Sequence, residues 1–88
     1  MNRNQLEYFI SLGETLSFTE TAKRHLVSQA AISQQIQRLE AELNVTLIER
    51  NSRPVKLTGA GKVFLQEAKS ILERMDISIS RARAMENK

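Results

Sequence analysis

The chain has 88 residues, which is enough for one domain with a small hydrophobic core. It contains no cysteine, so disulfides and thiolate metal sites are excluded. No apolar run approaches the roughly 20 residues that cross a bilayer, and the N-terminus lacks the apolar stretch of a signal peptide. We therefore expect a cytoplasmic protein with no membrane contact.

The net charge of +3 is small, but the charges are unevenly distributed. Residues 21–39 and 50–66 together contain seven Lys and Arg and no Asp or Glu, and the remaining six Lys and Arg stand against ten Asp and Glu, a net charge of −4. Two acid-free basic windows favour a surface that meets a polyanion. Chance clustering on solvated helix faces fits the same pattern.

Two helices are predicted in the first third of the chain. Leu6 and Phe9 belong to an apolar pattern at helical spacing, which predicts a helix over residues 3–14. Ser17 and Glu20 fit the capping box S-x-x-E, so a second helix should begin at the residue after Ser17. The inner face of this second helix is expected to consist of Phe18, Ala22 and Leu26.

A third helix should begin after Ser28, a favourable N-cap, and stop at Asn44, which tolerates the left-handed conformation. When its residues are laid out at about 100° each, the apolar side chains fall in one stripe that should face the core. That stripe consists of Ile32, Ile36, Leu39 and Leu43.

The opposite face of this third helix carries amides, a hydroxyl, a methyl and a guanidinium, and no acid. Its members are Gln29, Ala30, Ser33, Gln34, Gln37 and Arg38. Such side chains can reach base edges in a DNA major groove, and two helices joined by a tight turn form a helix-turn-helix. An ordinary solvated face is the alternative, but solvated faces usually mix Glu and Lys, which residues 29–37 lack.

Two short strands, 46–50 and 55–57, are predicted next, joined by a turn over residues 51–54. A β-hairpin with an arginine, Arg53, at its tip is a wing. The alternative is a surface hairpin that merely closes the core.

A fourth helix, capped by Thr58, should extend to about Ala84, and the polar tail 81–88 is expected to fray. Gly59 and Gly61 at its start allow a close approach or a sharp entry. Six apolar residues, spaced alternately by three and four, form an unbroken heptad seam on this helix. The seam consists of Leu65, Ala68, Leu72, Met75, Ile79 and Ala82.

A helix of roughly 40 Å cannot bury that seam within an 88-residue monomer. We therefore expect the same helix of a second chain to cover it, which gives a symmetric homodimer. The alternative is that the seam packs on a domain outside this chain.

Catalysis is not expected. His25 lies beside Lys23 and Arg24 at the end of the second helix, without the partners that a triad or a metal site needs. The sequence has no Gly-rich phosphate loop, and its aromatic residues are better explained as core than as a stacking platform. We predict no enzyme activity, no metal and no cofactor in this chain.

With these residues in place, the chain resembles the DNA-binding half of a LysR-type transcriptional regulator over nearly all of its length. The matching motifs are Leu6-x-x-Phe9, then Ser17-Phe18-Thr19 with Ala22, then SQAAISQQIQRLEAEL from Ser28, then Leu47-Ile48-Glu49-Arg50, and last Leu57-Thr58-x-Ala60-Gly61. Each motif is weak alone, but five in order at matching spacings are specific.

The resemblance implies a mainly α fold: a winged helix-turn-helix over residues 1–57 and a dimerising linker helix over residues 58–88. It also implies a C-terminal effector-binding domain that is absent from this chain and senses a small-molecule inducer. Family members generally bind interrupted palindromes with a T…A core, often as tetramers, and activate or repress genes. The chain departs from the usual pattern at Ala30, where Pro is frequent, and at Thr21, where Ala is usual.

The layout of the third helix and the resemblance together predict the contacts with duplex DNA. The residues predicted to contact base edges are Gln29, Ala30, Ser33 and Gln34, since Gln can pair with adenine and a methyl can meet the thymine methyl. The residues predicted to contact the DNA backbone or to act in the wing are Ser17, Thr19, Ser28, Gln37, Arg38, Arg50 and Arg53. Arg53 is expected to enter or flank the minor groove, and Arg50 to steady the wing or reach phosphate.

Two other functions remain open. The helix-turn-helix can be a scaffold for a protein-interaction module whose functional surface is the long helix. RNA binding is less favoured, because paired RNA hides its major groove and single-strand readers need exposed aromatics.

Overall fold

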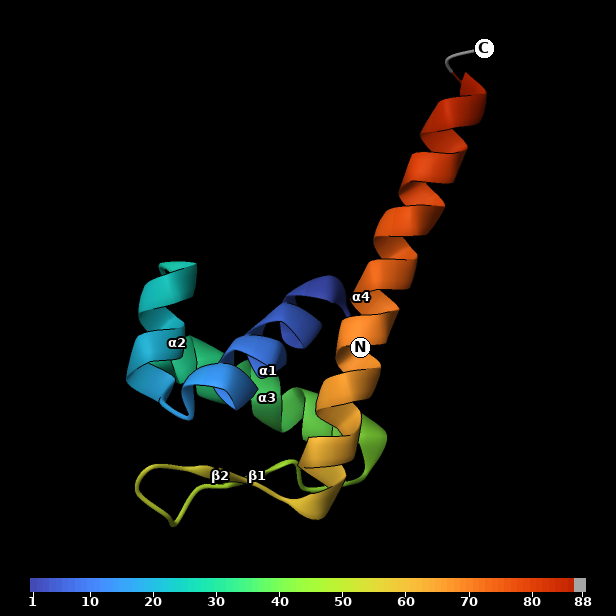
Figure 1. Ribbon diagram of the computed structural model, residues 1–88. Helices are drawn as coiled ribbons and strands as arrows, with labels where there is room; N and C mark the ends of the chain where they lie inside the picture. Colours follow the sequence, from blue (N-terminus) through green and yellow to red (C-terminus); the bar gives the residue numbers. More distant parts are fainter. Residues whose placement is uncertain (87–88) are drawn as a thin grey trace.

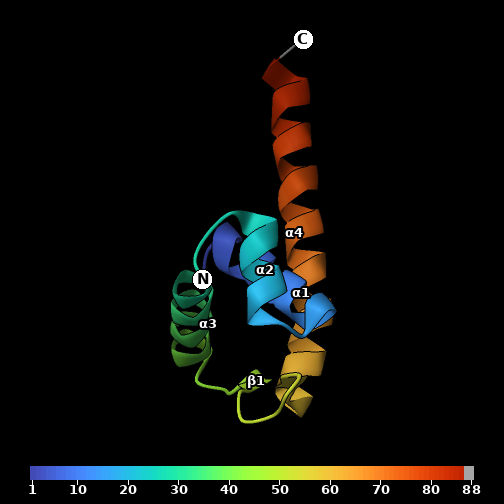
Figure 2. The same cartoon turned by 90° about the vertical axis from the view of Figure 1, so that its left-hand side faces the viewer.

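The computed structural model describes residues 1–86, and within that range it contains four helices and one β-hairpin. In chain order they are α1 (Arg3–Thr15), α2 (Phe18–His25), α3 (Gln29–Leu43), β1 (Ile48–Glu49), β2 (Lys56–Leu57) and α4 (Gly59–Glu86). The first three helices gather beside the lower part of α4, the hairpin lies at its base, and the upper part of α4 stands clear (Figures 1 and 2). The predicted mainly α winged helix-turn-helix with a long final helix is confirmed.

Side-chain caps set where the first three helices begin. The Asn2 side chain accepts a hydrogen bond from the Gln5 amide at 2.9 Å, and the Gln5 side chain accepts one from the Asn2 amide at 3.2 Å, which completes a capping box at α1. Ser28 caps α3 as predicted, accepting from the Ala31 amide at 3.0 Å. Ser17 caps α2 in the same way, but Glu20 does not return a bond, because the Ser17 amide donates to Thr15 Oγ1 instead. The predicted capping box at α2 is therefore only half correct.

Each of these three helices ends at a left-handed residue: Leu16, Leu26 and Asn44, with φ of 54°, 56° and 57°. Asn44 was predicted as a stop and is confirmed. Leu26 was predicted to face the core, and this is wrong, since it is 92% exposed. The left-handed turn after His25 directs the Leu26 side chain outward, and Val27 packs against the core in its place.

The core lies where α1, α3 and the base of α4 meet. The predicted inward stripe of α3 is confirmed, with Ile32, Ile36 and Leu39 fully buried. The rings of Phe9 and Phe64 pack with centroids 5.6 Å apart, joining α1 to α4. The buried apolar residues are Leu6, Phe9, Leu12, Ala22, Ile32, Ile36, Leu39, Leu47, Ile48 and Ala68.

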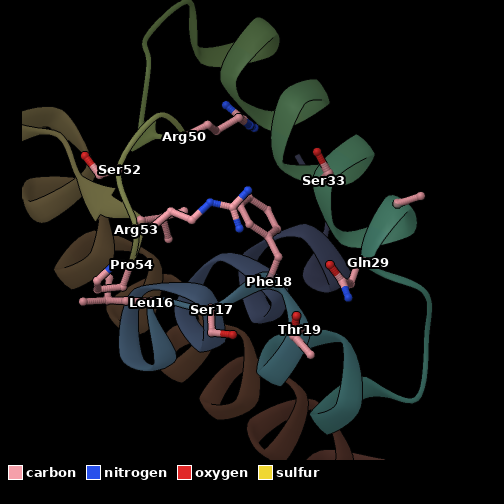
Figure 3. Close-up of a pocket in the computed structure, with 12 residues that line it drawn as sticks. Leu16, Ser17, Phe18, Thr19, Gln29, Ser33, Arg50, Ser52, Arg53 and Pro54 are labelled. Carbon is pink, nitrogen blue, oxygen red and sulfur yellow. The ribbon is translucent and has the colours of Figure 1, made fainter.

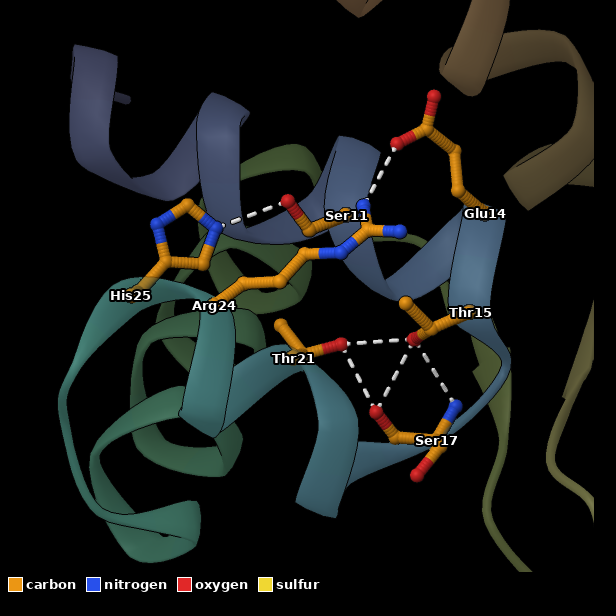
Figure 4. A network of polar contacts seen from close by, with 7 residues as sticks. All are labelled: Ser11, Glu14, Thr15, Ser17, Thr21, Arg24 and His25. Atoms are coloured by element: carbon orange, nitrogen blue, oxygen red, sulfur yellow. Dashed lines mark hydrogen bonds and ion pairs between the residues drawn. The ribbon is translucent and has the colours of Figure 1, made fainter.

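A small hydroxyl network fixes the angle between α1 and α2 (Figure 4). Thr21 is fully buried, and its hydroxyl donates to the Ser17 carbonyl at 2.8 Å and lies 2.9 Å from Thr15 Oγ1. The buried Thr21 hydroxyl is thus hydrogen-bonded, which explains why a threonine is tolerated in a close helix–helix contact.

His25 closes the other end of the same interface. Its Nε2 lies 2.8 Å from Ser11 Oγ (Figure 4). Its ring packs edge-on against Tyr8 with centroids 4.8 Å apart. A hydroxyl and a ring edge are packing partners, so this histidine occupies a structural position at the end of α2.

The hairpin is shorter than predicted. Strands were expected over residues 46–50 and 55–57, whereas β1 and β2 hold two residues each. They are antiparallel, with Ile48 opposite Leu57 and Glu49 opposite Lys56. Ile48 is buried, so the hairpin closes the core and also projects the loop 50–55 along the lower edge of the molecule (Figure 1).

The start of α4 is tied to the segment that leads into β1. Thr58 Oγ1 donates to the Thr46 carbonyl at 2.6 Å and accepts from the Gly61 amide at 2.9 Å, as predicted for a cap. A Cβ at Gly61 would lie 2.1 Å from the Leu47 carbonyl oxygen, which confirms that a close approach requires glycine here. At Gly59 a Cβ would meet nothing within 4 Å.

Arg3 joins α1 to α4 farther up. Its guanidinium hydrogen-bonds Asp76 and Glu7, each at 2.9 Å, and these bonds raise the pKa of Arg3 above its ordinary value. Beyond Asp76, α4 continues without a break to Glu86. The predicted fraying is therefore wrong for residues 81–86, and residues 87 and 88 lie outside the described part of the chain.

The seam of α4 divides into two parts. Ala68 is fully buried in the chain's own core, and Leu65 and Leu72 pack against that core. Ile79, by contrast, is 42% exposed, and Ala82 is exposed as well. The lower seam is thus covered largely within the monomer, and the upper seam projects apolar side chains into solvent. None of the described helices is long and apolar enough to span a membrane.

Candidate nucleic-acid interface

A cleft of about 490 Å³ opens between the starts of α2 and α3 and the hairpin loop (Figure 3). It is lined by Leu16, Ser17, Phe18, Thr19, Gln29, Ala30, Ser33, Arg50, Ser52, Arg53, Pro54 and Val55. The lining includes two arginines and no acid. Because the first turns of both α2 and α3 border the cleft, their N-terminal ends add positive potential to that of Arg53. The cleft therefore suits an anion such as a phosphate group.

Arg53 reaches across this cleft from the hairpin loop. In Figure 3 its side chain extends from the loop toward Phe18 and the start of α2, between the hairpin and α3. Arg53 is exposed, so the guanidinium is available to a ligand that enters the cleft. Arg53 lines the same cleft as Gln29 and Ser33, and its predicted contact with the minor groove stays a prediction.

The outward face of α3 carries a shallow depression next to the cleft. Six side chains line it: Ser28, Ala30, Ala31, Ser33, Gln34 and Gln37. The two alanine methyls supply apolar surface, and the surrounding groups are hydroxyls and amides. A convex helix with amides around exposed methyls matches what a major groove offers, namely donors, acceptors and thymine methyls.

Nearly all of the predicted DNA-contact residues fall on these two adjoining surfaces. Ser17, Thr19 and Gln29 border the cleft, and Gln34 and Gln37 border the depression. Arg38 is exposed on α3 but lines neither surface. The predicted set is thus brought to one side of the molecule, with Arg38 at its margin.

Arg50 proves to be tied down within the chain. Its Nη1 donates to Glu40 Oε1 at 2.9 Å, which favours the first of its two predicted roles, steadying the wing. Its Nε and Nη2 are buried and have no partner among residues 1–86. Arg50 therefore forms part of the cleft wall and is anchored by a carboxylate of α3.

Sequence reasoning missed three contributors, two in the hairpin loop and one on α3. Ser52 and Pro54 line the cleft, and only their place beside Arg53 in the loop indicated this. Glu40 accepts bonds from residues 7 to 10 positions away, a separation at which local patterns carry no signal. Within residues 1–86, no cluster of three His, Cys, Asp or Glu that could hold a metal ion is found.

Comparison with known proteins identifies the family. Residues 3–62 match the family described as bacterial regulatory helix-turn-helix protein, lysR family. The chain is 46% identical over 84 residues to the HTH-type transcriptional regulator TcbR of Pseudomonas sp. (strain P51), covering 96% of this chain and 29% of TcbR. It is 42% identical over 80 residues to the regulator BenM of Acinetobacter baylyi, covering 91% of this chain and 26% of BenM. The chain thus spans less than a third of these relatives.

Solved structures agree with the sequence comparison. The DNA-binding domain of CbnR, solved as a complex with DNA, superposes with a TM-score of 0.92 at 46% identity, covering 97% of this chain and 98% of that one. The DNA-binding domain of BenM, solved with benA site 1 DNA, gives a TM-score of 0.89 at 40% identity, with 97% and 99% covered. The family match covers most of the chain, and the solved domains match it from end to end. The chain therefore belongs to the LysR family of bacterial transcriptional regulators and corresponds to their winged helix-turn-helix DNA-binding domain.

Proposed function

We propose that this chain binds specific duplex DNA as a homodimer, with α3 in the major groove. The observation that carries this proposal is the exposed, acid-free, amide-rich face of α3 beside a cleft walled by two arginines. The DNA complexes of the related CbnR and BenM domains support it.

The roles of individual residues follow from their positions. Gln29, Ser33 and Gln34 are the candidates for hydrogen bonds to base edges, and Ala30 for contact with a thymine methyl. Ser17 and Thr19, at the start of α2, offer hydroxyls and backbone amides to phosphate. The other proposed contacts to the DNA backbone are Ser28, Gln37, Arg38 and Arg53.

The dimer is proposed from the upper part of α4. This helix has 28 residues and so extends about 42 Å, well beyond the α1 contact. Ile79 and Ala82 continue the heptad spacing of the seam into a segment that is exposed among the described residues. A second copy of α4 laid on this face would bury the exposed apolar side chains, and a two-fold axis would give two α3 helices suited to a palindromic site.

The complete regulator is proposed to carry a further domain, because the matched relatives are more than three times as long as the matched region. In this proposal that domain binds a small-molecule inducer, the intact protein forms a dimer or tetramer, and it acts in the cytoplasm on an interrupted palindrome with a T…A core. Domain boundaries at residues 57 and 58 fit the end of β2 at Leu57 and the start of α4 at Gly59.

Gln29→Ala tests base readout most directly. Fluorescence anisotropy would compare a pool of T…A interrupted palindromes with scrambled duplex, for the wild type and the variant. Losing a base contact should cost about 1–3 kcal/mol on the preferred sites and little on scrambled DNA. Gln66→Ala is the matched control, because Gln66 is exposed on α4 and lines neither the cleft nor the depression. An equal loss on both kinds of DNA would remove Gln29 from base readout.

The protein-interaction function is the competing proposal, and the upper seam of α4 is the feature that favours it. It predicts no preference for any duplex at low salt. The same titration therefore separates the two functions.

A further inference from the structure

We propose that Glu40 is a positioning residue for DNA binding: its carboxylate holds the wing, residues 48–57, at the correct place relative to α3. This inference rests on the proposed function and adds to it a residue that does not itself contact DNA.

Glu40 makes three hydrogen bonds to the segment that begins the wing. Its Oε2 accepts from the backbone amides of Leu47 at 2.7 Å and Ile48 at 3.3 Å, and its Oε1 accepts from Arg50 Nη1 at 2.9 Å. The Glu40 side chain is only 12% exposed. One side chain of α3 therefore holds both the backbone that enters β1 and the side chain of Arg50, the residue that follows β1.

Arg50 depends on Glu40 for its charge balance. Two of its guanidinium nitrogens are buried without a partner in the described chain, so the Glu40 carboxylate is the group that offsets its charge. Without that carboxylate, a half-buried guanidinium with two buried nitrogens would be left unpaired, which is unfavourable. The arginine would then leave its place, and the loop that carries Arg53 would lose its attachment to α3.

Because Glu40 is negatively charged, the direction in which its removal changes DNA affinity tests the inference. An acid on α3 of a DNA-binding protein repels the phosphates, so its removal should strengthen DNA binding if electrostatics alone acts. If Glu40 instead positions the wing, its removal should weaken binding even though the net charge rises by one.

The experiment measures duplex affinity of Glu40→Gln by anisotropy, with Glu42→Gln as the matched control. Glu42 lies on the same helix, is exposed, and pairs only with the N-terminal ammonium among the described residues. We expect Glu40→Gln to bind about tenfold more weakly, the order associated with a lost charge-assisted hydrogen bond. Glu42→Gln should bind as tightly as the wild type or slightly more tightly. A Glu40→Gln variant that behaves like Glu42→Gln would overturn the proposal.

A second readout separates wing position from general stability. If Glu40 acts through the wing, Glu40→Gln should lower affinity much less in an Arg53→Ala background, because the wing contact is already lost there. Losses that are fully additive, with a folded fraction shown by circular dichroism to be unchanged, would contradict the proposal.

Glu40→Asp keeps the net charge and guards against a Glu40→Gln variant that does not fold. Its shorter side chain cannot reach both the amides and Arg50, so affinity should fall in the same direction by a smaller factor. Affinity equal to the wild type would count against the proposal.

Failure of this inference can be distinguished from failure of the proposed function. If the wild type binds no duplex at low salt, the function fails. Amide proton shifts of Leu47 and Ile48 still test the Glu40 contacts in the free protein. They should move upfield in Glu40→Gln and stay unchanged in Glu42→Gln, and unchanged shifts in both variants would overturn the inference.

Discussion

Replacing Gly61 with alanine should destabilise the protein, because there is no room for a methyl group between α4 and the segment before β1. The new Cβ would lie 2.1 Å from the Leu47 carbonyl oxygen, whereas ordinary contact begins at 3.4 Å. A displacement of about 1.3 Å, the difference between these distances, is needed. Leu47 cannot move freely, since its amide donates to Glu40 and its carbonyl accepts from the Thr58 amide at 3.0 Å.

The magnitude follows from what must give way. Loss of the Thr58–Leu47 bond and weakening of the charge-assisted Glu40–Leu47 bond cost about 1 and 1.5–3 kcal/mol respectively. Alanine regains at most about 1 kcal/mol through its higher helix propensity. The net loss is then about 1.5–3 kcal/mol, which for a domain of this size lowers Tm by about 6–24 °C.

Gly59→Ala is the matched control, because a Cβ there meets nothing within 4 Å and only the propensity gain remains. Its Tm should be unchanged or raised by a few degrees. Both variants would be melted by circular dichroism at one protein concentration, since the proposed dimerisation would make Tm concentration-dependent. A Gly61→Ala variant as stable as the wild type would refute the close approach of α4 to Leu47.

Three further perturbations test the fold, the wing and the dimer. Thr21→Val should lower stability by about 1–2 kcal/mol in a denaturant titration, because both hydrogen bonds of the buried Thr21 hydroxyl are lost; no change would mean that the network contributes nothing. Arg53→Ala should weaken DNA binding and flatten the dependence of affinity on salt, because a cation near phosphate is lost; an unchanged slope would move Arg53 off the DNA. Ala82→Asp should split the dimer in sedimentation, whereas Ala84→Asp, about 160° away on the same helix, should not. Identical behaviour of those two variants would mean that the seam is not the dimer contact.

Features with a local physical cause were predictable from the sequence. Helix α3 begins after Ser28 and ends at Asn44, because a hydroxyl cap and a left-handed asparagine act within one turn of the chain. The buried stripe of α3 followed from its 3.6-residue period. The glycine at position 61 indicated a close approach, although its neighbour Leu47 could not be named.

Features that depend on distant parts of the chain were not predictable. Leu26 continues the apolar period of α2, and only the left-handed turn after His25 takes it out of the core. Ala68 has seam spacing, but the contact of α4 with α1 buries it within the monomer. The candidate site shows the same division: its α3 residues were evident from periodicity, whereas the Glu40–Arg50 pair was visible only after folding.

The most direct test of the central claim is an anisotropy titration of the wild-type chain at two salt concentrations, with T…A interrupted palindromes and scrambled duplex as ligands. The account predicts tighter binding to the palindromes, two chains per duplex, and affinity that falls steeply as salt rises. Equal affinity for both duplexes, or binding to neither at low salt, would contradict sequence-specific recognition by α3.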